Sequence, residues 1–223
     1  METKGFSIGE VVKSGWRIMK DNIGFFIGLL LVSYIIIFLP MIIAGLLGED
    51  ALLLKIILYI IYIVLALLIG MGLIKISLQF CDNEKGRFGD LFSCFPLILK
   101  YLFAAILYIL IFYAGLILLI FPGIIWGIKF SLFPYFIVDK NMGIIESLKA
   151  SSRATKGAKW DILGFWFVAW VISLSGMLCL LIGLFATIPT IMVATALVYR
   201  KLSSQTVTEQ KPVEKPAEPA ATV

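Results

Sequence analysis

Long apolar stretches alternate with short charged segments along the whole chain. The apolar stretches cover residues 23–47, 52–74, 97–121, 124–138, 162–184 and 188–199. A helix needs roughly 20 mostly apolar residues to cross a bilayer, and most of these stretches exceed that length. Hydrophobic residues make up 61% of the 223 residues and charged residues 15%, whereas soluble proteins have roughly 45–50% and 25%. The pattern predicts an all-α fold, a polytopic membrane bundle of six transmembrane helices.

The first charged segment, residues 6–20, has the periodicity of an amphipathic helix. Its apolar residues fall at helical spacing on one face, and its charged residues fall on the other. The segment is too polar to cross a membrane. We therefore expect it to lie in the interface between the bilayer and water.

The charge pattern of this segment recurs later in the chain. One acidic and three basic residues match a second set at the same spacing: Glu10, Lys13, Arg17 and Lys20 correspond to Glu146, Lys149, Arg153 and Lys156. A weaker copy begins at Phe88 and ends at Lys100. Each copy precedes two apolar stretches, which predicts three hairpins, each preceded by a cytoplasmic interfacial amphipathic helix. Chance similarity in an apolar sequence is the alternative explanation.

The repeat divides one integral membrane domain, residues 1–202, into units of about 6–74, 86–138 and 143–202. A proline follows the acidic residue of each unit, at Pro40, Pro122 and Pro189. Beyond residue 202 the chain is mainly Ser, Thr, Gln, Lys, Pro, Glu and Ala, a composition that cannot bury apolar surface. We therefore expect residues 203–223 to form a disordered cytoplasmic tail.

The distribution of positive charge predicts the orientation of the chain. Of the 19 Lys and Arg residues, all but Lys55 and Lys129 lie in four segments: before the first span, from the end of the second span to Lys100 at the start of the third, after the fourth and after the sixth. Basic segments next to spans stay on the cytoplasmic side. The sequence thus predicts a multi-pass protein of the cell membrane with both termini in the cytoplasm.

The basic residues of the repeat are the first candidate site. They can contact anionic lipid headgroups, and the proposed contacts are Lys13, Arg17, Lys20, Lys149, Arg153 and Lys156. Each basic residue near an anionic surface contributes on the order of 1 kcal/mol. The favoured interpretation is that these charges only set topology, because any cytoplasmic loop is basic. The segments are short and face a membrane, so we expect no nucleic acid partner.

Lys129 is the second candidate, because it lies inside an apolar stretch. An ionisable residue within a span is a functional hypothesis in itself, and it usually has a partner. No Asp or Glu lies within the predicted spans. Lys129 is therefore expected either to reach the interface or bind freed carbonyl groups, which is the favoured reading, or to contact a substrate or lipid phosphate.

Most catalytic chemistry finds no support in the sequence. The chain has no histidine, which excludes His-based acid–base catalysis, nucleophile activation and metal ligation. The three cysteines, Cys81, Cys94 and Cys179, have no metal-ligand spacing, and those on the cytoplasmic side should be free thiols. The sequence also has no nucleotide-binding or hydrolase motif. We therefore expect no metal, no cofactor and no enzymatic activity.

Two stretches carry a resemblance to a known family. They are Pro122-Gly-Ile-Ile-Trp-Gly-Ile-Lys-Phe-Ser-Leu-Phe-Pro and, from Glu146, Glu-Ser-Leu-Lys-Ala-Ser-x-Arg-Ala-Thr-Lys-Gly. The chain resembles uncharacterised prokaryotic six-span proteins related to the membrane domain of glycerophosphodiester phosphodiesterases. The resemblance implies the same six-span architecture. It implies no phosphodiesterase activity, because the histidines and the catalytic barrel of the fused relatives have no counterpart here.

These observations predict a non-enzymatic membrane protein, a scaffold or a protein that shapes its lipid environment. Its expected partner is the lipid bilayer, and anionic lipids and another membrane protein are further candidate partners. The alternative is a small transporter or channel-like carrier for an anionic solute or lipid, with Lys129 on its path.

Overall fold

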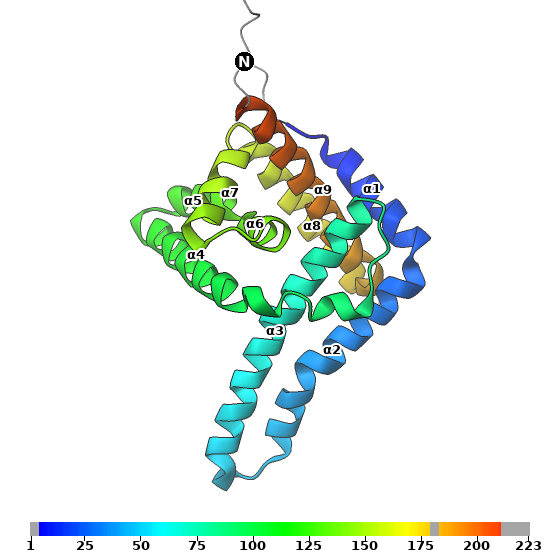
Figure 1. Cartoon of the computed structure of the whole chain (residues 1–223), viewed down its shortest axis with the longest axis vertical. Helices are drawn as coiled ribbons and strands as arrows, with labels where there is room; N and C mark the ends of the chain where they lie inside the picture. Colours follow the sequence, from blue (N-terminus) through cyan, green and yellow to red (C-terminus); the bar gives the residue numbers. More distant parts are fainter. Residues whose placement is uncertain (1–4, 179–182, 211–223) are drawn as a thin grey trace, which may run out of the picture.

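The computed structural model describes residues 5–178 and 183–210, and in these residues all regular structure is helical (Figure 1). The α-helices are α1 (Ile8–Asp21), α2 (Ile23–Leu46), α3 (Leu52–Cys81), α4 (Ile98–Leu118), α5 (Ile120–Phe130), α6 (Phe133–Lys140), α7 (Ile144–Ala154), α8 (Lys159–Leu178) and α9 (Leu184–Gln210). Short 3-10 turns lie at η1 (Glu49–Ala51), η2 (Phe88–Leu91) and η3 (Phe95–Leu97). Helices α2 and α3 lie side by side, and the halves that meet at the turn between them extend away from the other helices (Figure 1).

Six helical segments of the described chain are long and apolar enough to cross a membrane. They are Ile23–Leu46, Leu52–Cys81, Phe88–Leu118, Phe121–Lys140, Lys159–Leu178 and Leu184–Thr206. Many of their apolar side chains point outward, as expected for a surface solvated by lipid. The prediction of an all-helical membrane protein with six candidate spans is confirmed.

Several predicted boundaries differ from the observed ones. Helix α3 continues to Cys81, so the loop expected from Lys75 begins inside a helix. The weaker copy of the repeat, which begins at Phe88, does not start as an α-helix but as the two turns η2 and η3. Pro96 at the start of η3 lacks an amide hydrogen and interrupts helical bonding there. Helix α9 continues to Gln210, eight residues into the tail that was expected to be disordered; residues 211–223 lie outside the described residues.

The fourth predicted span consists of two helices. Helix α5 ends at Phe130, and α6 begins at Phe133 with Pro134 in its first turn. Proline disfavours helical backbone in the residue before it and cannot bond to the preceding turn. Pro122, expected to separate two spans, lies instead in the first turn of α5, where a missing amide hydrogen costs nothing. The break therefore falls near the middle of the span and frees backbone groups there.

Each charged segment of the repeat packs on a helix of another predicted unit. Helix α1 lies along α9, η2 lies on α3, and α7 lies on α5 and α6 (Figure 1). The same repeat position is buried in all three copies, as Val11, Leu91 and Ser147 are at most 1% exposed. Close approach requires glycine at two contacts: a Cβ atom on Gly15 would lie 2.7 Å from the carbonyl oxygen of Thr190, and one on Gly72 would overlap the backbone of Leu91.

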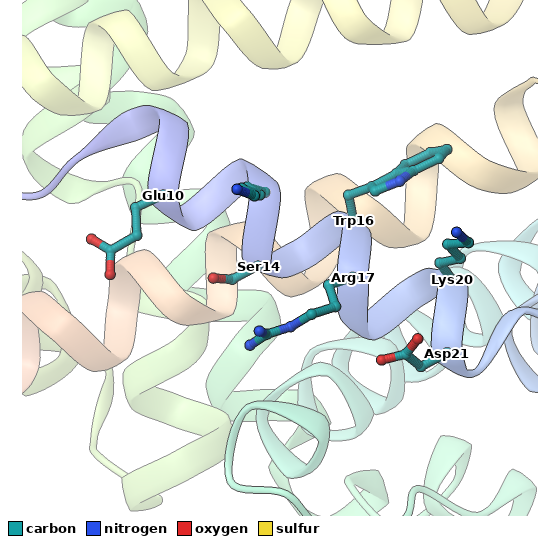
Figure 2. A pocket seen from close by; sticks show the side chains of 7 residues that line it. Glu10, Ser14, Trp16, Arg17, Lys20 and Asp21 are labelled. Carbon is teal, nitrogen blue, oxygen red and sulfur yellow. The ribbon is translucent and has the colours of Figure 1, made fainter.

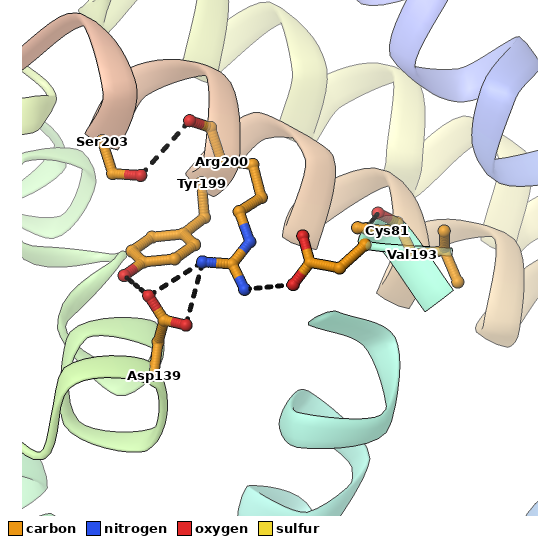
Figure 3. A network of polar contacts seen from close by, with 7 residues as sticks. Cys81, Asp139, Val193, Tyr199, Arg200 and Ser203 are labelled. Carbon is orange, nitrogen blue, oxygen red and sulfur yellow. Dashed lines mark hydrogen bonds and ion pairs between the residues drawn. The ribbon is translucent and has the colours of Figure 1, made fainter. Parts of the chain in front are cut away.

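Ion pairs join helices that are distant in sequence. The Arg200 guanidinium contacts both carboxylate oxygens of Asp139 at 2.9 Å and also pairs with Asp82 at the end of α3. Tyr199 donates its hydroxyl to Asp139 at 2.7 Å (Figure 3). This cluster joins α3, α6 and α9, which are the second helical arms of the three predicted units.

The acidic residue of the repeat has a related role in two copies. Lys201 of α9 donates to Glu10 of α1 at 2.8 Å, and Lys75 of α3 lies 3.6 Å from Asp90 in η2. In the third copy, Glu146 accepts the backbone amide of Gly143 and caps its own helix. The acidic position thus fixes the charged segment to its neighbour or starts the helix.

Candidate functional site

The site begins with the hydroxyl-bearing face of α7, which is buried. Ser147, Ser151 and Thr155 are each 0% exposed and lie one turn apart. Ser151 and Thr155 donate to the carbonyl oxygen of Lys129 at 3.0 and 3.1 Å, and Ser151 accepts the amide of Leu132 at 3.1 Å. These bonds satisfy backbone groups that the break between α5 and α6 leaves without helical partners. The hydroxyls therefore hold α7 against the end of α5.

The exposed face of α7 then lies beside the side chain of Lys129. Lys129 and Phe130 of α5, together with Lys149, Ser152 and Arg153 of α7, line a groove of about 370 Å³. We call these five residues the Lys129 groove. The two candidate features of the sequence, Lys129 within a predicted span and the basic stripe, thus meet in one place.

The positive charge of the Lys129 groove has no counter-charge among the described side chains. Its lining residues include three cations and no carboxylate. Among residues 5–178 and 183–210, none forms an ion pair with Lys129, Lys149 or Arg153. The Lys129 ammonium lies 5.2 Å from the centre of the Phe130 ring, a cation–π contact. Three uncompensated cations in one groove favour an anionic ligand.

The first copy of the repeat forms a second, weaker groove on α1. Its polar side chains line a space of about 360 Å³ beside Trp16 (Figure 2). Lys13, Arg17 and Lys20 contribute positive charge, but Glu10 and Asp21 line the same space. The two carboxylates offset much of this charge, so we regard the Lys129 groove as the stronger candidate for an anion.

The candidate residues from the sequence fall into three groups. Lys129, Lys149 and Arg153 share one groove, whereas Lys13, Arg17 and Lys20 share the other. Lys156 lies in the turn after α7, exposed to solvent, and is not among the residues that line the Lys129 groove. Sequence reasoning missed the contributions of Phe130 and Ser152. The available signal was the four-residue spacing of Ser151 and Thr155, which places both hydroxyls on one face and predicts that α7 packs through that face.

Metal or thiol chemistry gains no support from the described part of the chain. Residues 5–178 and 183–210 contain no group of three His, Cys, Asp or Glu side chains that could hold a metal ion. Cys81 and Cys94 are free thiols, as expected, and Cys179 lies outside the described residues. What the site offers is charge and hydrogen-bond donors.

Comparison with known proteins places the chain near an uncharacterised group. No protein-family model and no solved structure matches it. The UPF0259 membrane protein of Pectobacterium carotovorum is 31% identical over 91 residues, which are 41% of this chain and 36% of that protein. The chain thus matches only about a third of that relative's length. This similarity and the six apolar segments support a multi-pass membrane protein, without a link to phosphodiesterases.

Proposed function

We propose that this protein is a non-enzymatic membrane scaffold that binds the phosphate of anionic phospholipids in the Lys129 groove. The observation that carries the proposal is the convergence of Lys129, Lys149 and Arg153 in one groove without a carboxylate. Binding charged lipid at a rigid position would let the protein organise the lipids around it and contact a partner membrane protein.

The chemistry of the groove suits a phosphate monoester or diester. Arginine can bind two phosphate oxygens with its planar guanidinium, and lysine acts as a compact positive charge. The Ser152 hydroxyl adds a donor that can reach a further oxygen. With about 1 kcal/mol from each cation, the three together favour an anionic over a neutral headgroup by roughly a hundredfold.

The proposed orientation places the Lys129 groove in the cytoplasmic leaflet of the membrane. In this arrangement the chain forms three hairpins in the cell membrane, both termini lie in the cytoplasm, and α1 and α7 lie at the cytoplasmic interface. The basic segments between spans support this orientation. The cytoplasmic leaflet carries the negative surface potential, so a cationic groove there meets anionic lipids.

The position of Lys129 favours binding over transport. A carrier for an anionic solute would need Lys129 on a path between spans. Here its ammonium contributes to a groove shared with α7, the most charged segment near it. The proposed role of Lys129 is therefore to hold a lipid at the edge of the bundle.

The test is the amount of anionic lipid that stays with the protein in mild detergent. We expect the combined substitution Lys129→Gln, Lys149→Gln and Arg153→Gln to lower retained phosphatidylglycerol relative to phosphatidylcholine by roughly a hundredfold. The control removes three cations elsewhere: Lys85→Gln, Arg87→Gln and Lys156→Gln, residues that line neither groove. Equal loss in both variants would refute a specific site. Altered flux of an anionic solute in vesicles with Lys129→Met would instead support the carrier.

A further inference from the structure

An apolar pocket lies between α5 and α8, next to the Lys129 groove. It has a volume of about 340 Å³, and its lining includes Phe121, Ile125, Ile128, Lys159, Trp160 and Leu163. Lys159 is the only charged residue among those that line it. The pocket thus has apolar walls and one cation at the start of α8.

Helix α5 joins this pocket to the Lys129 groove. Ile125 and Lys129 are four residues apart, so they lie on the same face of α5, about 6 Å apart along its axis. Phe121 continues this face in the other direction, one turn before Ile125. One stripe of α5 therefore runs from apolar side chains to the cation of the groove.

The two ends of this stripe complement the two ends of a phospholipid. The groove offers three cations to a phosphate, and the pocket offers apolar walls to a hydrocarbon chain. Lys159 can extend its ammonium toward the headgroup while its methylene groups line the pocket. Trp160, beside it, is the type of residue that prefers the headgroup level of a bilayer.

We infer that one acyl chain of the bound anionic phospholipid occupies the pocket between α5 and α8 while its phosphate occupies the Lys129 groove. This inference rests on the proposed function and specifies its ligand as a whole lipid molecule. Inorganic phosphate or a water-soluble headgroup would lack the contacts of the chain. Each methylene of the chain that is withdrawn from water raises affinity by about fourfold.

The test uses phosphatidylglycerol with a diazirine in the middle of one acyl chain. The full-length protein is placed in nanodiscs that contain this lipid, irradiated and digested, and the adducts are located by mass spectrometry. We expect adducts concentrated in residues 121–128 and 160–163. This map needs no substitution, so it stands even where a variant fails to fold. Adducts spread evenly over the lipid-facing residues of the spans would overturn the inference.

Two substitutions then test occupancy. Ile125→Trp should fill the pocket and lower the adducts there several-fold. Leu174→Trp is the matched control, since Leu174 also lies in an apolar span and is as exposed as Ile125, at 44%, but lines no part of the pocket. Equal adducts in the two variants would contradict the inference.

The variant of the Lys129 groove separates this inference from the proposed function. With Lys129→Gln, Lys149→Gln and Arg153→Gln combined, pocket adducts should fall together with retained lipid. If retained lipid falls but pocket adducts persist, the chain pocket is independent and the inference is wrong, whereas the proposed function stands. If retained lipid does not depend on the groove, the proposed function itself fails.

Discussion

Ser151 donates its hydroxyl to the main-chain oxygen of Lys129 at a distance of 3.0 Å, which joins two residues 22 positions apart. The same oxygen atom of Ser151 accepts the amide of Leu132. One side chain thus satisfies a donor and an acceptor on either side of the break between α5 and α6. The candidate site depends on this contact, because it holds the cations of α7 beside Lys129.

Replacing Ser151 by Ala should destabilise the protein and loosen the groove. The amide of Leu132 would lose its acceptor in a buried position, which costs on the order of 1–3 kcal/mol. The free energy of unfolding in detergent measures this loss. Ser175→Ala is the control, because Ser175 donates to a carbonyl within its own helix and is exposed. A loss at Ser151 no larger than at Ser175 would show that the contact does not hold the break.

Two glycines of α3 test the packing of the second charged segment. Gly72→Ala would place a Cβ atom against the backbone of Leu91, and such overpacking costs roughly 1–3 kcal/mol. Gly70→Ala, two residues earlier, meets nothing within 4 Å and should be neutral or mildly stabilising, because alanine favours helix. Thermal unfolding of the two variants compares them directly. Similar melting temperatures would contradict the close approach of η2 to α3.

The neighbouring cations Arg200 and Lys201 of α9 should differ in how much they stabilise the protein. Arg200 joins α3 and α6 through Asp82 and Asp139, and the side chain of Asp139 is only 15% exposed. Removing one partner of a buried pair costs about 3–5 kcal/mol, and the partial exposure of Arg200 lowers this figure. Lys201 pairs with Glu10, whose side chain is 64% exposed, so its loss should cost less than about 1 kcal/mol.

The two variants to compare are Arg200→Gln and Lys201→Gln, by chemical unfolding in the same detergent. Arg200→Gln should be the less stable of the two. The reverse order would mean that the cluster at Asp139 does not hold α3, α6 and α9 together.

The orientation can be tested by cysteine labelling. In a background without native cysteines, Lys85→Cys should react with a membrane-impermeant maleimide only from the cytoplasmic side. Asp50→Cys, in the turn between α2 and α3, should react only from the opposite side, because that turn lacks Lys and Arg. Both positions are exposed in the structure, so access does not limit the reaction. Reaction of Asp50→Cys from the cytoplasm would reverse the proposed topology.

Hydropathy was sufficient to predict the spans, because burial in lipid acts on each stretch separately. The break near Ser131 was harder to predict, since Pro134 favours a break but its position depends on whether other groups satisfy the freed backbone. Ser151 and Thr155 supply those groups from another helix. Their spacing was visible in the sequence, but their partner was not.

The long-range ion pairs were not predictable for a related reason. Arg200 is 118 residues from Asp82 and 61 from Asp139. The sequence shows only that each lies near the end of an apolar stretch. Which helix ends meet depends on the packing of all three predicted units. The charge repeat did indicate positions that matter, since Glu10 and Asp90 both contact lysines of other helices.

The most direct test of the central claim is a double-mutant cycle on Lys129 and Arg153. The affinity of the purified protein for short-chain phosphatidylglycerol is measured by titration for the wild type, Lys129→Gln, Arg153→Gln and the combination. If both cations bind one phosphate, the losses should be non-additive by about 0.5–3 kcal/mol. Losses that add within about 0.5 kcal/mol, or no loss in either single variant, would contradict a shared site.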